Sequence, residues 1–241
     1  VQHSARVIVE EQLPGRDHRV LVVAGEVEAA ALRISDSVIL SPLQICERLT
    51  AATGSTVYLK REDLQMVRSY KIRGATNRLA KLSPEQRERG VIAASAGNHA
   101  QGVAFACRVL GINGRIYVPT TTPKQKRDRI RVHGGDAIEL VVTGNTFDEA
   151  AQAAREDAAA RGATVIEPFD SRDTVIGQGT VAAEIVSQLS SLGKALDTVV
   201  VPVGGGGLLG GCGAWLRERC PSTRIVGVEP AGAVSMAAAV R

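Results

Sequence analysis

The chain has 241 residues, of which 44% are apolar and 22% charged, so it can bury one large core or two small ones and is not expected to be disordered. No apolar run approaches the roughly 18 residues of a membrane span, and the start is polar, so we expect a cytoplasmic protein without membrane insertion or secretion. Four cysteines without a C-x-x-C pair or histidines at ligand spacing predict reduced thiols and no metal site: Cys46, Cys107, Cys212 and Cys220.

The net charge of +4 can be traced to residues 124–131, where five Lys or Arg residues accompany one Asp. A basic run is compatible with nucleic-acid binding, but it more often forms the solvated face of a helix. This segment follows Thr122-Pro123, has a helical pattern and carries no aromatic side chain between its charges. We therefore expect a solvated helix and no nucleic-acid partner.

The first 90 residues give a mixed pattern. Residues 1–25 stay unassigned, although residues 19–24 have the composition of a short strand. Helices are predicted at 26–34 and, after a bend at Ser41-Pro42, up to about residue 49. A strand at 57–59 precedes the polar residues 60–63, and a helix is predicted over 70–82 with Ser69 as its N-cap.

Strands and helices alternate strictly from residue 91 onward. This alternation predicts an α/β protein in which right-handed crossovers build parallel sheets covered by helices on both faces. The number of elements indicates a small α/β domain, residues 91–166, inserted in a larger discontinuous domain made of residues 26–90 and 167–241. Strands are predicted at 91–94, 115–118, 137–142, 164–166, 198–203 and 224–228, and helices at 98–110, 123–132, 147–160, 178–192 and 208–220.

Lys71 is the first candidate for chemistry because it falls in the first turn of the predicted 70–82 helix. A lysine is more often a solvated surface charge. At this position, however, the positive end of the helix dipole and the charges of Arg68 and Arg73 disfavour an ammonium ion, so we expect the pKa of Lys71 to be lowered. A neutral lysine amine is a nucleophile, and the aldehyde of pyridoxal phosphate is its natural electrophile.

The stretch 95–102, Ser-Ala-Gly-Asn-His-Ala-Gln-Gly, is a second candidate because it follows a strand and opens a helix. Open α/β sheets bind ligands at such places. The Ser95 hydroxyl, the Asn98 amide and the free N–H groups of the helix start can bind a carboxylate or a phenolic oxygen. The same residues also suit a plain capped helix start, and a lone histidine such as His99 is more often structural than catalytic.

The run Gly204, Gly205, Gly206 and Gly207 lies between the most apolar predicted strand and a helix, which disfavours a flexible linker. Glycines there let successive backbone N–H groups bind one anion, helped by the helix dipole. The competing interpretation is a nicotinamide-dependent dehydrogenase. Residues 205–210 fit G-x-G-x-x-G, and Glu229 ends the next strand where a ribose-binding acid belongs.

In combination the three motifs favour a pyridoxal phosphate site, since they supply an amine, a carboxylate loop and a phosphate loop. As a set, residues 69–75, 95–102 and 204–210 resemble the cofactor lysine, substrate loop and phosphate loop of the fold-type II, tryptophan-synthase-β-like pyridoxal phosphate enzymes, and within them the threonine dehydratases most closely. Stretches at 42–44, 57–64, 122–126, 133–136 and 227–230 support the resemblance, which runs in the same order over residues 26–241.

The resemblance implies two parallel-sheet, three-layer αβα domains and pyridoxal 5'-phosphate as the cofactor. The reaction it implies is the elimination and deamination of L-threonine, and more slowly of L-serine, to a 2-oxo acid and ammonia by a homo-oligomer. Serine dehydratase or racemase and threonine synthase activities stay open. Lys71 would bind the cofactor covalently and act as base, Asn98 would bond its ring hydroxyl, Gly204, Gly205, Gly206, Gly207 and Leu208 would hold its phosphate, and Ser95, Gly97, Asn98 and His99 would receive the substrate carboxylate.

Two departures from the family shape the expectations. The family carries a Ser or Thr facing the pyridine nitrogen and, in biosynthetic dehydratases, a regulatory domain, both expected beyond Arg241. We therefore expect a weakly active fragment that lacks the C-terminal part of the larger domain and leaves its last strand as an open sheet edge. In relatives that racemise serine, a Ser precedes the Gly-Asn pair; Ala96 stands here, so we expect no racemisation.

Overall fold

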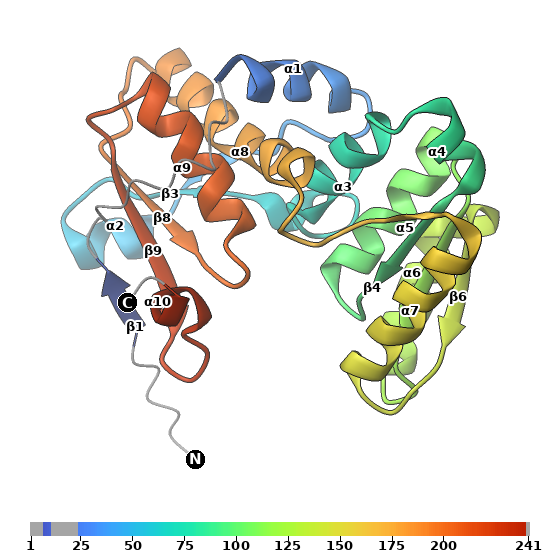
Figure 1. Cartoon of the computed structure of the whole chain (residues 1–241). Helices are drawn as coiled ribbons and strands as arrows, with labels where there is room; N and C mark the ends of the chain where they lie inside the picture. Colours follow the sequence, from blue (N-terminus) through green and yellow to red (C-terminus); the bar gives the residue numbers. More distant parts are fainter. Residues whose placement is uncertain (1–6, 11–23, 240–241) are drawn as a thin grey trace.

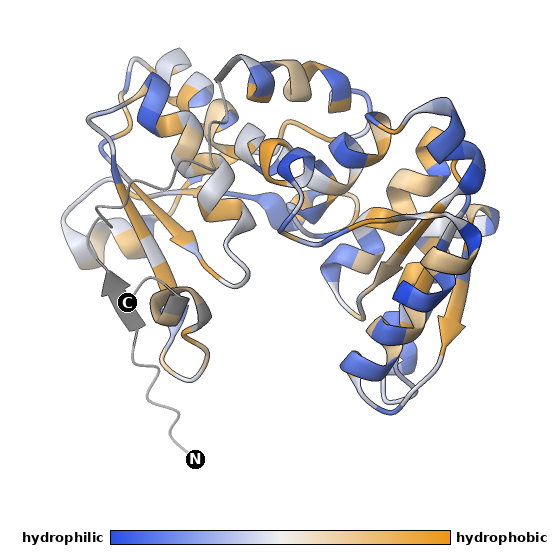
Figure 2. Ribbon diagram, in the orientation of Figure 1, coloured by the Kyte–Doolittle hydropathy of each residue, from blue (hydrophilic) through white to orange (hydrophobic). Residues whose placement is uncertain are grey.

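The computed structural model describes residues 7–10 and 24–239 of the chain. Figure 1 shows two lobes; α3 (Lys71–Ala80) lies between them, and α8 (Arg172–Ser191) lies within the larger one. One lobe contains a four-stranded sheet, and the other contains a three-stranded sheet. Apolar residues gather on the strands of both sheets and on the helix faces that cover them (Figure 2). The architecture is the α/β fold that the alternation of elements predicted.

The four-stranded sheet is parallel throughout and has the order β6-β5-β4-β7. Each of its strands and connecting helices lies within two residues of its predicted bounds. The strands are β4 (Val91–Ala94), β5 (Gly114–Val118), β6 (Ile138–Val142) and β7 (Thr164–Val165), and the connections run through α5 (Asn98–Leu110), α6 (Lys124–Gly134) with a 3-10 turn at Gly135–Ala137, and α7 (Phe147–Arg161).

Helices cover both faces of this sheet because successive strand residues point to opposite sides. On one face Ile92 and Tyr117 pack against Ala154 and Ala158 of α7. On the other face Ile116 packs against side chains of α5 and α6. We propose that this sheet and its helices form the inserted domain over residues 91–166, with residues 26–90 and 167–241 as the larger domain.

Helix α8 is central to the larger lobe, where it packs against α1 (Ala24–Ile34), α3 and α9 (Gly207–Arg219). The three-stranded sheet has the order β1-β9-β8. In it β8 (Thr198–Pro202) runs parallel to β9 (Arg224–Pro230), while β1 (Val7–Glu10) runs antiparallel to β9. A last helix, α10 (Ser235–Ala239), follows β9.

Strand β9 is not the open edge of its sheet, so this part of the prediction is wrong. β1 pairs with β9 from Val7 opposite Pro230 to Glu10 opposite Gly227. Within the described residues the edge strands of this sheet are β1 and β8, and on β8 Val200 is 63% exposed. β1 was not predicted, because the first 25 residues, with their scattered charges, give no clear element. Residues 19–24, which have the composition of a short strand, lie outside the described residues, except for Ala24, which begins α1.

The segment before α3 contains an antiparallel pair, β2 (Leu43–Ile45) and β3 (Tyr58–Lys60), that belongs to neither larger sheet. The strand predicted at 57–59 is therefore present, but it does not join a parallel sheet. Between and after these strands lie α2 (Glu47–Thr53) and a 3-10 turn at Glu62–Leu64. Helix α4 (Pro84–Arg89) was not predicted, although Ser83 and Gln86 form a capping box at its start.

Helices α8 and α9 approach each other through glycines. A Cβ on Gly211 would lie 2.2 Å from Val175 O, and one on Gly179 would lie 2.8 Å from Gly211 O. Both contacts are with backbone, which cannot rotate away as a side chain can. On Gly213, two residues further along α9, a Cβ would lie 3.9 Å from Ile225 Cδ1, an ordinary van der Waals distance.

We expect Gly211→Ala to lower the free energy of unfolding of the full-length protein by about 1–3 kcal/mol, the usual cost of overpacking. Gly213→Ala is the matched control, because it improves helix propensity by up to about 1 kcal/mol without a clash. Its stability should be unchanged or higher. Urea unfolding followed by the fluorescence of the buried Trp215 measures both, and equal losses would contradict the described approach of α8 and α9.

The described cysteines are all free thiols, and burial raises the pKa of Cys107 and of Cys212 to about 12, so both stay protonated. Across residues 7–10 and 24–239, no group of three or more His, Cys, Asp or Glu side chains is arranged to hold a metal ion. None of the helices in that part of the chain has the length and hydrophobicity needed to cross a bilayer.

Candidate active site

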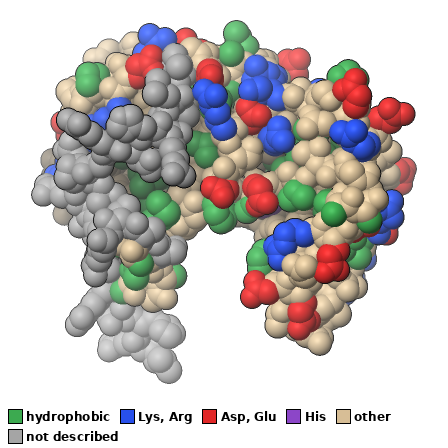
Figure 3. Space-filling view, in the orientation of Figure 1, with side chains coloured by type: hydrophobic (Ala, Val, Ile, Leu, Met, Phe, Trp, Pro, Cys, Tyr) green, Lys and Arg blue, Asp and Glu red, His purple; other side chains and the backbone are tan. Residues whose placement is uncertain are grey.

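The connections of the four-stranded sheet reverse direction at β4. From β4 the chain adds β5 and β6 on one side, and β7 returns to the other side. In open α/β sheets, ligands bind beyond the carboxyl ends of the strands that flank such a reversal. Here those ends lead into residues 95–98 and 166–169, and the molecular surface is hollowed between the two lobes (Figure 3). These two segments are the part of the small sheet where a ligand is expected.

Lys71 is the first residue of α3. Ser69 Oγ accepts a hydrogen bond from Lys71 N at 3.2 Å, so Ser69 caps the helix start although Tyr70 occupies the N-cap position. Arg68, just before, has a φ of 58°. A long side chain adopts this left-handed backbone conformation only where the surroundings hold it, and such positions cluster at functional sites. The chain therefore enters α3 through a strained turn, which fixes the start of the helix at Lys71.

The Lys71 side chain is half-buried and has no carboxylate partner among the described residues. Its Nζ donates one hydrogen bond there, to Pro168 O at 2.8 Å, and lies 5.4 Å and 5.9 Å from the ring centres of Tyr70 and Phe169. Burial lowers the pKa of Lys71. The predicted direction is confirmed, but the cause is desolvation and not the charges of Arg68 and Arg73.

Lys60 shows what a structural buried lysine looks like in the same fold. Its Nζ lies 2.6 Å from Glu184 Oε2 and donates to Ser41 O at 2.7 Å and to Gln188 Oε1 at 2.9 Å. Burial lowers the pKa of Lys60 too, but Glu184 partly offsets it. With three acceptors, one of them a carboxylate, the Lys60 amine has no free donor and no tendency to react. Lys71 is thus the half-buried lysine suited to nucleophilic chemistry.

Residues 95–99 lie at the start of α5, as predicted. Gly97 N donates to Ser95 Oγ at 3.2 Å, and Asn98, the first helical residue, is exposed. A Cβ on Gly102 would lie 3.0 Å from Lys71 O. Because residues four apart share one helix face, Asn98 lies on the face of α5 that meets the start of α3. His99 instead is buried, with Nε2 2.8 Å from Ile166 O.

The glycine loop reaches the same place through Phe169. A Cβ on Gly205 would lie 2.3 Å from the Phe169 ring, and one on Gly207 would lie 3.0 Å from Phe169 Cβ. Gly206 has a φ of 81°, which favours glycine. Helix α9 begins at Gly207, so the N–H of Leu208 is among the first in the helix, which lack intrahelical partners and attract anions. Phe169, which the sequence did not single out, joins the lysine to this loop.

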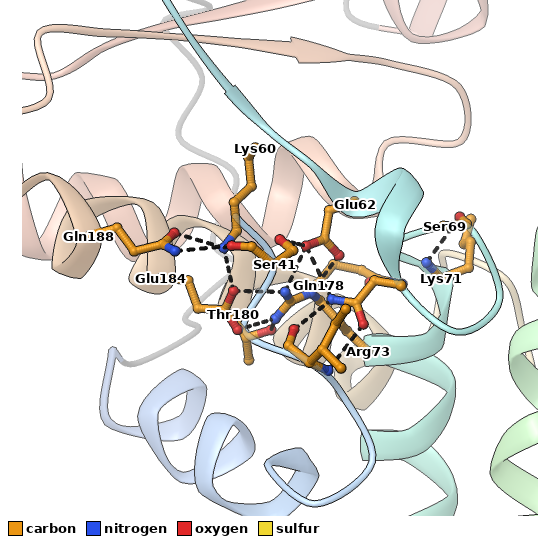
Figure 4. A network of polar contacts seen from close by, with 12 residues as sticks. Ser41, Lys60, Glu62, Ser69, Lys71, Arg73, Gln178, Thr180, Glu184 and Gln188 are labelled. Carbon is orange, nitrogen blue, oxygen red and sulfur yellow. Dashed lines mark hydrogen bonds and ion pairs between the residues drawn. The ribbon is translucent and has the colours of Figure 1, made fainter. Parts of the chain in front are cut away.

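A buried ion cluster lies behind Lys71 and was not predicted (Figure 4). Arg73 is 0% exposed and donates from all five N–H groups at 2.6–3.1 Å, two to Glu62, two to Glu184 and one to Thr180. Burial alone would raise the pKa of Glu62, but the bonds from Arg73 hold it below its usual value. Residues two apart on a helix point to nearly opposite sides, so the cluster anchors the back of α3.

The site fits the predicted cofactor. A pyridoxal phosphate needs an amine that can lose its proton and a concentration of N–H groups for its phosphate. The Lys71 amine is desolvated and lightly bonded, and the glycine loop at the start of α9 lies against Phe169, beside that amine. The dinucleotide alternative fits less well, because both carboxylate oxygens of the buried Glu229 accept backbone N–H groups, from Met236 and Ala237 at 2.9 Å.

Known proteins are similar to this chain over most of its length. A biosynthetic L-threonine dehydratase of Corynebacterium glutamicum is 62% identical over 234 residues, 96% of this chain and 54% of that protein. The solved structure of the processed form of threonine deaminase isoform 2 from Solanum lycopersicum has a TM-score of 0.87 and 42% identity, covering 98% of this chain and 62% of that one. Maize serine racemase has a TM-score of 0.78 and 31% identity, covering 84% and 59%.

The chain spans about half the length of the curated relatives that it matches. The family described as pyridoxal-phosphate dependent enzyme matches residues 34–241, which include the lysine, the Asn98 loop and the glycine loop. This chain belongs to the family of pyridoxal-phosphate dependent enzymes.

Proposed function

We propose that the protein containing this chain is a threonine ammonia-lyase, which converts L-threonine, and more slowly L-serine, to a 2-oxo acid and ammonia. With L-threonine the product is 2-oxobutanoate, the first intermediate on the way to isoleucine. The observation that carries the proposal is the desolvated Lys71 amine, held by Pro168 O and joined through Phe169 to the glycine loop. The 62% identity to a biosynthetic L-threonine dehydratase supports the choice of substrate. We further propose a cytoplasmic homo-oligomer.

When bound, pyridoxal phosphate supplies an aldehyde and an electron sink for the substrate's Cα. Its aldehyde would be held by Lys71 Nζ and its ring hydroxyl by the Asn98 amide. Its phosphate would be held by the N–H groups of the glycine loop, where a helix N-terminus and the absence of side chains favour an anion. The residues that would bind the phosphate are Gly204, Gly205, Gly206, Gly207 and Leu208.

Lys71 would also move the Cα proton of the substrate. A base must be partly unprotonated at the working pH, and burial lowers the pKa of the Lys71 amine toward that range. The half-buried ring of Tyr70 and the Phe169 ring flank the amine and limit water around it. Since the neutral amine is the active form, the rate should rise with pH as Lys71 loses its proton.

The substrate carboxylate would be received at the start of α5. Ser95 and Asn98 supply a hydroxyl and an amide, and Gly97 leaves room, since a Cβ there would meet nothing within 4 Å. The first N–H groups of α5 add the positive end of a helix dipole. We retain Ser95, Gly97 and Asn98 in this role, and His99 is treated separately below.

A racemase is the alternative that the similarity to maize serine racemase raises. Racemisation needs a second proton-transfer group on the cofactor face opposite the lysine. The residue before the Gly-Asn pair is Ala96, whose methyl cannot exchange a proton, and it packs near the apolar cluster of α5 and β5. This residue favours one-base elimination.

We expect the full-length protein to form no D-serine from L-serine in deuterium oxide, so that all the serine left during turnover stays in the L configuration. Ala96→Ser should add a measurable racemase activity, because relatives that racemise serine carry a Ser at this position. Chiral chromatography with mass detection gives both results. D-serine from the unaltered protein at a rate comparable with elimination would contradict the one-base assignment.

Turnover with L-threonine tests the proposed function. The full-length protein should release 2-oxobutanoate and ammonia in equal amounts, measured by hydrazone formation and by an ammonia assay without added nicotinamide nucleotide. Strict dependence on a nicotinamide nucleotide, or equal inertness toward L-threonine and L-serine, would reject the proposal.

A further inference from the structure

The segment formed by residues 166–169 contacts Lys71, His99 and the glycine loop. It follows β7 at the sheet reversal and runs toward α8. Ile166 O accepts from His99 Nε2, Pro168 O accepts from Lys71 Nζ, and Phe169 packs against Gly205. Its position therefore sets the surroundings of the Lys71 amine more directly than any other connection does.

The neutral His99 ring has one N–H group, and this group donates a hydrogen bond to Ile166 O. The partner of Nε2 is a carbonyl oxygen, so Nε2 must carry the hydrogen. Burial lowers the pKa of His99 to about 4, so the ring is neutral at physiological pH and its Nδ1 is unprotonated. That Nδ1 is buried and has no hydrogen-bond partner among the described residues. A neutral ring whose single N–H is already bonded has nothing to offer a substrate carboxylate.

The positions of the two acceptors connect His99 to Lys71. Ile166 and Pro168 are two residues apart on one short segment that bends at Pro168, so holding the first carbonyl restricts the second. Three other groups face His99 or its segment: the Lys71 ammonium, which disfavours protonation of His99, Ile92 O, which accepts from Ile166 N, and Thr174, which bonds Glu167 O. Only the His99 bond comes from the substrate loop itself.

We propose that His99 is a positioning residue, which holds the 166–169 segment through Ile166 O and thereby places Pro168 O against the Lys71 amine. This inference rests on the proposed role of Lys71 and replaces the predicted contact of His99 with the substrate carboxylate. His99 shapes the amine's surroundings, while Ser95 and Asn98 remain for the carboxylate.

Two substitutions of His99 distinguish the role of Nε2 from that of Nδ1. Glutamine can place its amide N–H near the position of Nε2, whereas asparagine reaches only to Nδ1. In the full-length protein freed of cofactor, His99→Asn should make the amide of Ile166, which donates to Ile92 O, exchange with deuterium about tenfold faster. It should also raise the pKa of Lys71 by about one unit, because water then enters around the amine. His99→Gln should restore both quantities.

Both readouts are independent of turnover. Trace acylation across pH, with the peptide of the exposed Lys126 as internal reference, reports the pKa of Lys71, and His133→Asn on α6 is the matched histidine control. With cofactor bound, His99→Asn should lower kcat for L-threonine about 10- to 100-fold and change KM less than twofold. Unchanged exchange and Lys71 pKa, or a tenfold rise in KM at constant kcat, would overturn the positioning role.

A measurement on the unaltered protein covers the case in which the variants do not fold. In protein labelled with nitrogen-15 histidine, the His99 ring should show a protonated, pyrrole-type Nε2 and an unprotonated, pyridine-type Nδ1. This should hold from about pH 6 to about pH 8, where an ordinary histidine changes its charge. A proton on Nδ1 would overturn the proposal. Failure of L-threonine turnover with these signatures intact would reject the proposed function and leave the positioning role standing.

Discussion

Replacing Lys71 by Ala should lower kcat for L-threonine by about three orders of magnitude or more, since one amine both holds the cofactor aldehyde and moves the Cα proton. The structure gives a reason why no other lysine takes over. Lys60, the other half-buried lysine described above, is bonded to three acceptors that include the Glu184 carboxylate. Steady-state release of 2-oxobutanoate by the full-length protein measures the loss.

Two controls show whether the lost amine is the cause. Lys81→Ala removes a lysine from the other end of α3, where it pairs with Asp173, and should leave kcat unchanged. Added ethylamine should restore part of the activity of the Lys71→Ala variant, because a small amine can enter the space of the missing side chain. A kcat within tenfold of the unaltered protein would remove Lys71 from the chemistry.

Replacing Arg73 by Met should lower the free energy of unfolding by about 3–5 kcal/mol, the usual cost of removing one partner from a buried ion pair. Arg73 is the fully buried partner of Glu62 and Glu184, and methionine fills part of its volume without any donor. The two carboxylates would remain in the cluster, with the Lys60 ammonium beside Glu184. Urea unfolding of the full-length protein at pH 7 measures the effect.

The pH dependence of this loss identifies its origin. In the unaltered protein the bonds from Arg73 hold the pKa of Glu62 below its usual value, although burial opposes this, so their stabilisation is complete above the ordinary carboxyl pKa and disappears as pH falls through the lowered one. The gap between Arg73→Met and the unaltered protein should therefore narrow as pH falls below the ordinary carboxyl pKa of 4.5. Arg61→Met, which breaks an exposed pair with Asp63, should change stability little. A gap that does not depend on pH would contradict the ionic origin.

The small sheet could be predicted from sequence because each of its elements follows a local pattern. Residues 91–94 are a short apolar run, Asn98 opens a periodic helix, and Gly111 ends it in the left-handed conformation. Local signals of this kind also located Lys71 and the glycine loop. The three-residue strands β2 and β3 were assigned less well, since such short strands are defined by their partner and not by a period.

The contacts that give the site its character could not be predicted, because they join residues far apart in the sequence. Pro168 O is 97 residues from Lys71, and Glu184 is 111 residues from Arg73. From sequence, Arg73 was taken as a charge acting on Lys71. In the structure two carboxylates neutralise it, and desolvation lowers the pKa of Lys71 instead. In the sequence, a fully buried arginine cannot be distinguished from an exposed one when its neighbours along the chain are small and apolar.

Reduction with borohydride followed by peptide mapping tests the central claim most directly. The full-length protein should show an absorption band in the near-ultraviolet or visible range, and this band should disappear on reduction. The reduced protein should then carry one pyridoxyl group, on the peptide that contains Lys71. Its Asn98→Ala and Gly205→Ala variants should be labelled at the same lysine but less completely at limiting cofactor. The account predicts label on Lys71 alone; label on Lys60 or another lysine, or no bound aldehyde at all, would contradict it.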